Sequence, residues 1–360
     1  MTPQILNQRR LTVAGFIGLY LHGIIVATPG AFLPHWRLAF DNLVNVGAFY
    51  TTFLLSSLLG LSIVSQQKKR HPIFAIAFTT IGIAFAVSSL SSTFFWIVLA
   101  ALPIGFGDGI LNFHCNNLVG ELHPNRRIMM LNWANATFGL GALSTPILTT
   151  LLPWRWVFWL ISALALSSLI LAWNAPSVRH YTPKQDQILW KQASPFWLVI
   201  FLYVGLESSL GTWSATYLTS VGWSRAASSA LLSIYWVGLT LGRLSLSIWV
   251  NHKPVSRLRL LLLAGLGAIA LTFIPSFGLF FAGAAFLYGP VFATLFALLQ
   301  ERCGHLALGY LFYAAYVGKT LIPALLDQMD NPLNLRYGFL ALAFLLYLMS
   351  FQLLSRKSGV

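Results

Sequence analysis

Four ionisable side chains lie near the middle of long apolar stretches of this sequence. They are His22, Asp108, Glu207 and Lys319. A charge in hydrocarbon is costly, so such groups are retained where they pair, bind a solute or carry a proton. We therefore treat all four as candidates, with Asp108 and Glu207 as the carboxylates with which Lys319 could form an ion pair.

Asp108, Asn112 and Asn116 recur every four residues, which places them on one face of a helix. A carboxylate and two amides can hydrogen-bond the hydroxyl groups of a polar solute. The alternative is that they join neighbouring helices inside a bundle. We predict solute binding by Asp108 and Asn112, whereas Asn116 fits both interpretations equally well. The three glycines between positions 105 and 109 are expected to permit close helix packing.

A second polar group surrounds Glu207, which shares a helical face with Tyr203. Glu207 is a candidate for solute binding, for carrying a proton, or for a structural ion pair with Lys319. Trp213 lies further along the same segment and suits either stacking on a sugar ring or anchoring at the membrane interface.

Three further residues have two interpretations each. His22 either titrates near neutral pH and takes part in coupling, or is a neutral histidine bonded to a backbone carbonyl. Asn135 is a candidate for solute contact or for a hydrogen bond between helices. Arg243 is expected to brace an inner gate rather than to touch the solute.

The composition shows which solvent surrounds these groups. Of the 360 residues, 57 % are hydrophobic and only 8 % are charged, against about 25 % charged in soluble domains. Lipid must therefore be the main solvent. The net charge of +14 comes from short basic clusters between apolar runs, which is typical of membrane topology signals and not of a nucleic-acid partner.

A membrane helix needs about 20 mostly apolar residues, and this window predicts twelve spans. They are 11–35, 43–64, 72–91, 94–118, 127–152, 155–174, 194–220, 225–250, 257–275, 277–300, 307–328 and 333–354. The longest polar stretch divides the chain into an N-terminal six-helix half (1–174), a cytoplasmic linker (175–193) and a C-terminal six-helix half (194–360). We thus predict an all-α membrane protein with two pseudo-symmetric halves.

The distribution of basic residues predicts the orientation. With the N-terminus in the cytoplasm, most loop Lys and Arg residues fall on the cytoplasmic side. The opposite side receives only Arg37, Arg155, Arg225 and Arg336. Both termini are therefore expected in the cytoplasm, with the protein in the inner (plasma) membrane of a bacterium.

Several stretches resemble the major facilitator superfamily, and most closely its fucose–proton symporter branch. Residues 105–116 read Gly-Phe-Gly-Asp-Gly-Ile-Leu-Asn-Phe-His-Cys-Asn, and 203–213 read Tyr-Val-Gly-Leu-Glu-Ser-Ser-Leu-Gly-Thr-Trp. The Gly242-Arg243 pair also fits. Gly141 with Pro146 and Gly318 with Pro323 have the same spacing, as two repeated halves require. The resemblance implies the major facilitator fold and transport by alternating access.

Two departures from that branch concern coupling. Its proton symporters carry carboxylates in the first and fourth helices, where this chain has Gly30 and Asn112. The loop after the second span is reduced to Gln-Gln-Lys-Lys-Arg at 66–70. Proton coupling and the identity of the substrate therefore stay open.

The expected function is secondary transport of a small polar solute, with a sugar or a related compound as the candidate. No phosphate-binding loop and no zinc-ligand spacing occurs, so we expect no cofactor, no metal and no enzyme activity. The alternatives are a membrane-embedded enzyme that uses Asp108, His22 or Glu207, and a transporter-like receptor that binds without transport. The expected partners are the solute, membrane lipid and, as a candidate, protons; we expect a monomer without nucleic acid.

Overall fold

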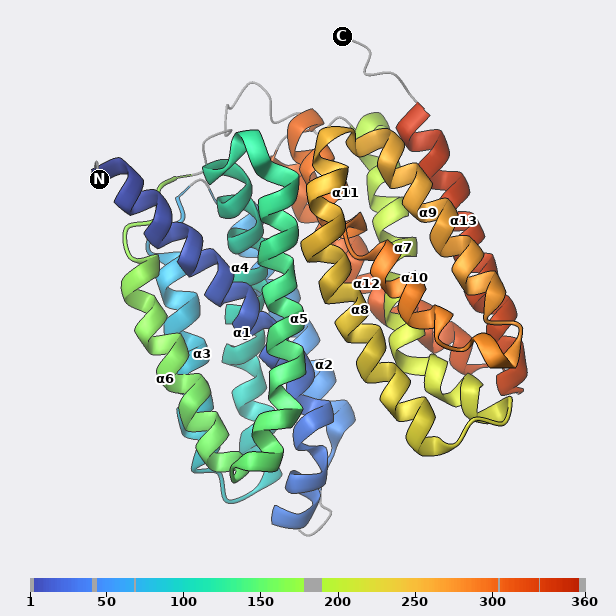
Figure 1. Ribbon diagram of the computed structural model, residues 1–360. Coiled ribbons are helices and arrows are strands. Elements are labelled where there is room, and N and C mark those ends of the chain that lie inside the picture. Colours follow the sequence, from blue (N-terminus) through green and yellow to red (C-terminus); the bar gives the residue numbers. More distant parts are fainter. Residues whose placement is uncertain are drawn as a thin grey trace. The chain divides into compact units, whose positions relative to one another are not determined.

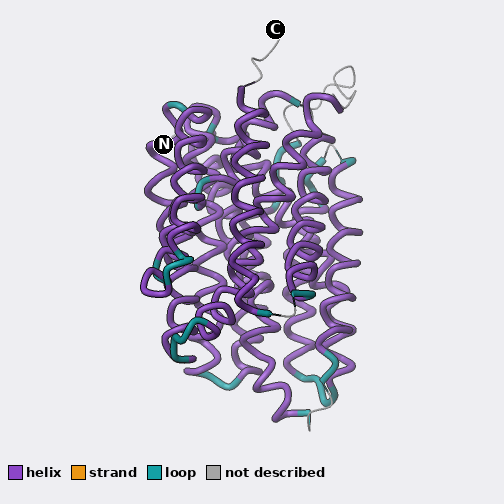
Figure 2. Tube along the Cα trace, turned by 90° about the vertical axis from the view of Figure 1, so that its right-hand side faces the viewer, coloured by secondary structure: helices purple, strands orange, loops and turns teal. Residues whose placement is uncertain are grey.

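The computed structural model describes residues 3–40, 44–67, 69–177, 190–303, 305–329 and 331–355. In that part of the chain the regular elements are helices and no strand occurs (Figure 2). Helices satisfy every backbone polar group internally, which lipid requires. Within these residues, 8 helices are long and apolar enough to cross a membrane.

The helices follow the predicted spans closely (Figure 1). Their bounds are α1 Pro3–Ala39, α2 Val46–Ser65, α3 Ile73–Ser89, α4 Phe94–Leu122, α5 Arg127–Leu151, α6 Trp154–Ala172, α7 Trp190–Ser220, α8 Arg225–His252, α9 Pro254–Leu271, α10 Phe280–Tyr288, α11 Val291–Arg302, α12 His305–Asp327 and α13 Leu335–Ser355. The α1 helix begins eight residues before its predicted start, and α7 begins at Trp190, inside the predicted linker.

The tenth predicted span, 277–300, contains two helices instead of one. The helix α10 ends at Tyr288 and α11 begins at Val291, on either side of Gly289 and Pro290. Proline cannot donate a backbone hydrogen bond and clashes with the preceding turn. Gly289 lies so close to α8 that a Cβ added to it would be 2.7 Å from the backbone nitrogen of Arg243. The break therefore coincides with a tight approach to α8.

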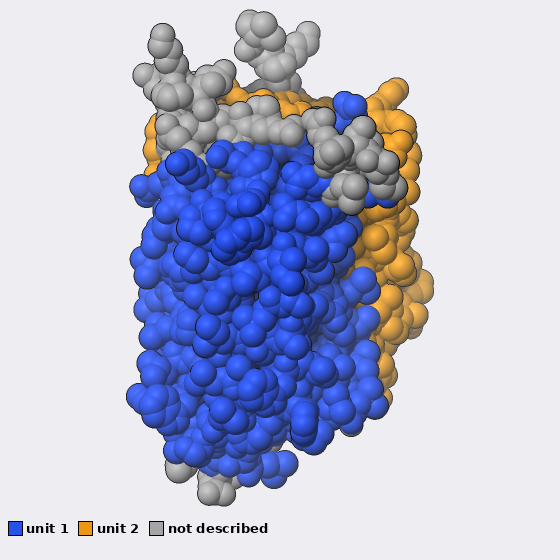
Figure 3. Space-filling model, turned by 90° about the vertical axis from the view of Figure 1, so that its left-hand side faces the viewer, with its two compact units in different colours: residues 1–125, 137–181 blue, residues 126–136, 182–360 orange. Residues whose placement is uncertain are grey.

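The chain forms two compact units, shown in different colours in Figure 3. Unit 1 contains residues 1–125 and 137–181, and unit 2 contains 126–136 and 182–360. Helix α5 thus contributes its first turns to unit 2 and the rest to unit 1.

Unit 1 is held by close crossings of α1 and α2 with α4, while α3 packs on α6. A Cβ on Gly60 of α2 would meet the Phe106 carbonyl of α4, and one on Gly109 would meet the Ser57 carbonyl of α2. The glycines of α4 therefore serve helix packing, as expected.

Unit 2 repeats these crossings. A Cβ on Gly242 of α8 would meet the Phe286 carbonyl of α10, which corresponds to the α2–α4 crossing. A Cβ on Gly318 of α12 would meet the Phe201 carbonyl of α7. In unit 1 the same holds for Gly141 of α5 and the Tyr20 carbonyl of α1. The repeated glycines found in the sequence, Gly141 and Gly318, therefore pack closely against equivalent helices of the two units.

Candidate functional site

A histidine–aspartate pair occupies the interior of unit 1. The α1 helix packs on α4, and His22 Nδ1 lies 2.6 Å from Asp108 Oδ1. The side chain of His22 is 13 % exposed and that of Asp108 is 0 % exposed. The ring of Phe138 on α5 lies 5.1 Å from the imidazole. Among the described residues, the other carboxylate oxygen, Asp108 Oδ2, is buried without a hydrogen-bond partner.

The structure corrects two expectations about this pair. The sequence suggested Lys319 as a partner of Asp108, and a backbone carbonyl as one possible partner of His22. The two side chains instead bond each other, because the α1–α4 contact brings them to the same level. Lys319 lies on α12 with an exposed side chain.

The predicted polar face of α4 differs in burial from one residue to the next. Asp108 and Asn116 are fully buried, whereas Asn112 is half-buried. The Asn116 amide donates to the Asn112 carbonyl at 2.8 Å and to its Oδ1 at 3.1 Å. Asn112 is thus the member of this face best placed to reach a solute directly.

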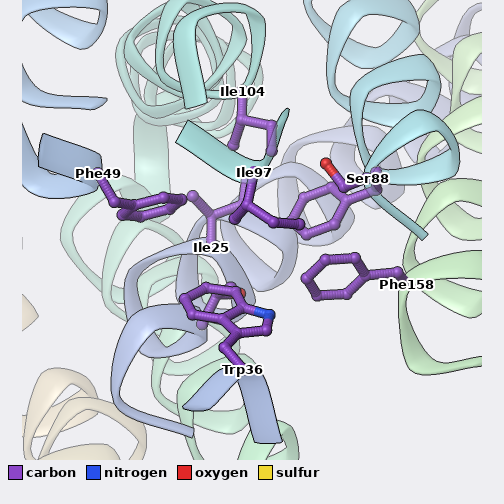
Figure 4. Close-up of a pocket in the computed structure, with 9 residues that line it drawn as sticks. Ile25, Trp36, Phe49, Ser88, Ile97, Ile104 and Phe158 are labelled. Atoms are coloured by element: carbon purple, nitrogen blue, oxygen red, sulfur yellow. The ribbon is translucent and has the colours of Figure 1, made fainter. Parts of the chain in front are cut away.

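A small apolar pocket lies about one helical turn from the His22–Asp108 pair along α1 and α4. Ile25 follows His22 by about one turn, Ile104 precedes Asp108 by about one turn, and both line a small pocket (Figure 4). The pocket is lined by Ile25, Thr28, Trp36, Phe49, Phe85, Ser88, Ile97, Ile104 and Phe158. Its cavity of ≈ 10 Å³ holds about one water molecule and no sugar.

A second carboxylate, the half-buried Glu207, lies in unit 2. The hydroxyl of Tyr203 donates to Glu207 Oε2, and Arg243 Nη2 lies 3.5 Å from Oε1. The hydroxyl of Tyr235 donates to the Glu207 carbonyl at 3.0 Å. The side chains of Glu207 and Arg243 are only 15 % and 5 % exposed. The structure therefore pairs Glu207 with Arg243, where the sequence suggested Lys319.

Arg243 reaches Glu207 because α8 packs on α7. Its Nη1 also donates to the Asn135 carbonyl at 3.1 Å, while the Asn135 amide donates to Leu131 of its own helix at 2.9 Å. These contacts make Arg243 part of the carboxylate cluster of unit 2. A role for Arg243 in gating and a role for Asn135 in binding both stay predictions.

Trp213 is half-buried on α7, and its indole nitrogen donates to the Pro323 carbonyl of α12 at 3.1 Å. Tyr217, one turn further on, is fully buried and donates to the Thr272 carbonyl at 3.1 Å. The hydrogen bond of the indole nitrogen thus fixes the ring of Trp213. Stacking of this ring on a sugar stays a prediction. The hydroxyl of Tyr217 is therefore occupied by a hydrogen bond within the protein.

One buried ion pair was missed from the sequence. Arg70 is 0 % exposed and binds Glu121 through two bonds of 2.7 and 3.1 Å. It also donates to the Pro176 carbonyl at 3.2 Å. The sequence placed the basic run at 66–70 in a loop. Only Glu121, the carboxylate near the end of α4, indicated a partner for Arg70.

Solved membrane transporters share this fold. The fucose:proton symporter FucP of E. coli has a TM-score of 0.80 at 14 % sequence identity, over 99 % of this chain and 100 % of that one. The human organic anion transporter TETRAN has a TM-score of 0.72 at 17 % identity, over 99 % and 100 %. At such identities the likeness concerns the fold alone.

The sequence model of the Major Facilitator Superfamily matches residues 11–323. This chain therefore belongs to the Major Facilitator Superfamily, which confirms the predicted fold of twelve membrane helices in two six-helix halves. The glucose/mannose transporter GlcP of Bacillus subtilis is 23 % identical over 257 residues, which covers 64 % of this chain and 63 % of GlcP. The match thus spans less than two thirds of that relative.

Proposed function

We propose that this integral membrane protein is a secondary transporter of a small polar solute, with monosaccharides as the first class to test. The observation that carries the proposal is a set of partly accessible polar side chains on membrane helices. These are Asn112 on α4, and Glu207 and Trp213 on α7. The amide in unit 1, and the carboxylate and indole ring in unit 2, each suit either the hydroxyl groups or the apolar face of a sugar. GlcP and FucP, both named as sugar transporters, support this class.

Each residue has a proposed role. Asn112 donates to and accepts from solute hydroxyls, and Glu207 accepts from a hydroxyl while Arg243 balances its charge. Tyr203 positions Glu207 through its hydroxyl, and Asn116 positions Asn112 through its amide. Buried polar groups of this kind fix the orientation of the groups that touch the solute.

Transport is proposed to occur by alternating access between the two six-helix halves, 1–174 and 194–360. We place the protein in a bacterial inner membrane as a monomer, with both termini and the linker 175–193 in the cytoplasm. The bias of basic loop residues supports this orientation.

The test is counterflow in proteoliposomes, in which unlabelled sugar inside exchanges for labelled sugar outside without any ion gradient. A panel of monosaccharides is compared for the wild type, Asn112→Ala and the control Asn117→Ala. Asn117 is an amide on the same helix that is buried and bonds to its own helix at Phe113. We expect exchange of at least one sugar, a strong loss in Asn112→Ala and retention in the control. No exchange of any sugar by the wild type would refute this function.

A further inference from the structure

We propose that the His22–Asp108 pair, and not Glu207, is the site that binds the proton coupled to transport. This inference rests on the proposed transport function and adds to it the identity of the proton site. It follows from how each of the two carboxylates is compensated.

Glu207 has a permanent cation beside it. Arginine stays protonated at any physiological pH, so Glu207 and Arg243 together carry no net charge and need no additional proton. Protonating Glu207 would leave the guanidinium of Arg243, only 5 % exposed, without its counter-charge. An unpaired charge in a buried site is strongly unfavourable. The Glu207–Arg243 pair is therefore not assigned the coupled proton.

Asp108 has a partner that compensates its charge only when a proton is present. With neutral imidazole the pair carries one negative charge, on a carboxylate that is 0 % exposed and has an unbonded Oδ2. With one additional proton the pair is neutral overall, either as imidazolium and carboxylate or as imidazole and carboxylic acid. Because burial disfavours an uncompensated charge, sealing the site from water favours the protonated pair.

Within the described residues of unit 1, the neighbouring helices offer the pair no other compensating charge. The described parts of α2 and α3, and α5 from residue 137 on, contain no Asp, Glu, Lys, Arg or His. Their nearby groups are neutral, as are Cys115 on α4 and Tyr20, whose hydroxyl bonds Ser144 at 2.8 Å. His114 and Glu121 lie further along α4, where Glu121 is paired with Arg70. The remaining charged groups of unit 1 lie near helix ends.

The exposed member of the pair offers the route for the proton. Asp108 is inaccessible, whereas His22 retains 13 % exposure. A proton from water thus arrives at the imidazole, is shared along the 2.6 Å bond with Asp108, and leaves by the same ring. Loading and release both occur at His22, in whichever access state wets it.

Proton-driven accumulation of solute tests which of the two carboxylates, Asp108 or Glu207, belongs to the proton site. Wild type, His22→Gln, Asp108→Asn and the matched control His114→Gln are compared in proteoliposomes with a pH gradient of one unit. One-to-one symport can then support about tenfold accumulation. We expect this for the wild type and the control, and an accumulation ratio of about one for His22→Gln and Asp108→Asn, with counterflow still measurable in His22→Gln. Glu207→Gln should exchange poorly but keep its response to the gradient.

A second measurement is independent of transport. Proton binding by the purified protein in lipid nanodiscs is titrated with a pH indicator, and each variant of the pair should bind about one proton fewer than the wild type. Loss of that proton in Glu207→Gln, with none lost in His22→Gln, would overturn the assignment. Absent counterflow in the wild type would refute the transport function alone, because the titration still decides which carboxylate binds the proton.

Discussion

At the scale of single residues, three carboxylates show three degrees of compensation. Glu121 has a bidentate arginine, Glu207 has a more distant arginine and a tyrosine hydroxyl, and Asp108 has only a histidine. The first arrangement suits a structural pair, because both charges are fully bonded. The last suits a group whose charge changes during function.

Breaking the structural pair should destabilise the protein. Arg70→Ala leaves Glu121 buried, only 3 % exposed at its side chain, with an uncompensated charge, and removal of one partner of such a pair costs about 3–5 kcal/mol. Thermal unfolding in detergent measures the loss. The double variant Arg70→Ala with Glu121→Gln should recover much of it, and an equally unstable double variant would argue against the ion pair.

The half-buried His123, just beyond α4, predicts a pH dependence. Its Nε2 lies 2.8 Å from Thr12 Oγ1, and burial lowers the pKa of this imidazole. The unfolded chain therefore binds the proton more readily, so stability is lost as pH falls through about 6.5. Melting temperatures between pH 8 and 5 should fall less steeply in His123→Gln. Parallel curves for the two proteins would show that His123 does not contribute.

At the scale of elements, glycines determine how closely the helices cross. A Cβ on Gly109 would run into the backbone of Ser57 on α2, whereas one on Gly267 of α9 would meet no atom within 4 Å. Both changes to alanine gain helix propensity of about 0.5–1 kcal/mol. We expect Gly267→Ala to raise the melting temperature and Gly109→Ala to lower it, since overpacking costs about 1–3 kcal/mol. Equal shifts would mean that the α2–α4 crossing tolerates a methyl group.

At the scale of the whole molecule, the predicted topology is testable at two exposed positions, Ser177 and Asn331. Ser177 follows the sixth span and Asn331 the eleventh, so the two should lie on opposite sides of the membrane. Single cysteines are introduced after replacement of Cys115 and Cys303, both of which are buried. An impermeant maleimide added to intact cells should label Asn331→Cys alone. Labelling of both positions, or of Ser177→Cys alone, would contradict the predicted orientation.

The sequence alone was sufficient for the class of protein and for the positions of its helices. Apolar runs of about 20 residues can span lipid only as helices, and each of the twelve predicted segments coincides with one helix, or in 277–300 with two. The break at Gly289 and Pro290 was not predicted, although proline interrupts a helix by its own chemistry.

The partners of the buried charges were decided by the tertiary structure. Spacing along one helix places Asp108, Asn112 and Asn116 on one face, but it does not show that Asp108 contacts His22 of another helix. In the same way, Arg243 reaches Glu207 because α8 packs on α7. Ion pairs between helices depend on crossing points set by packing, which join residues 86 and 36 positions apart in the chain. The periodicity of a single helix does not show where that helix crosses its neighbours.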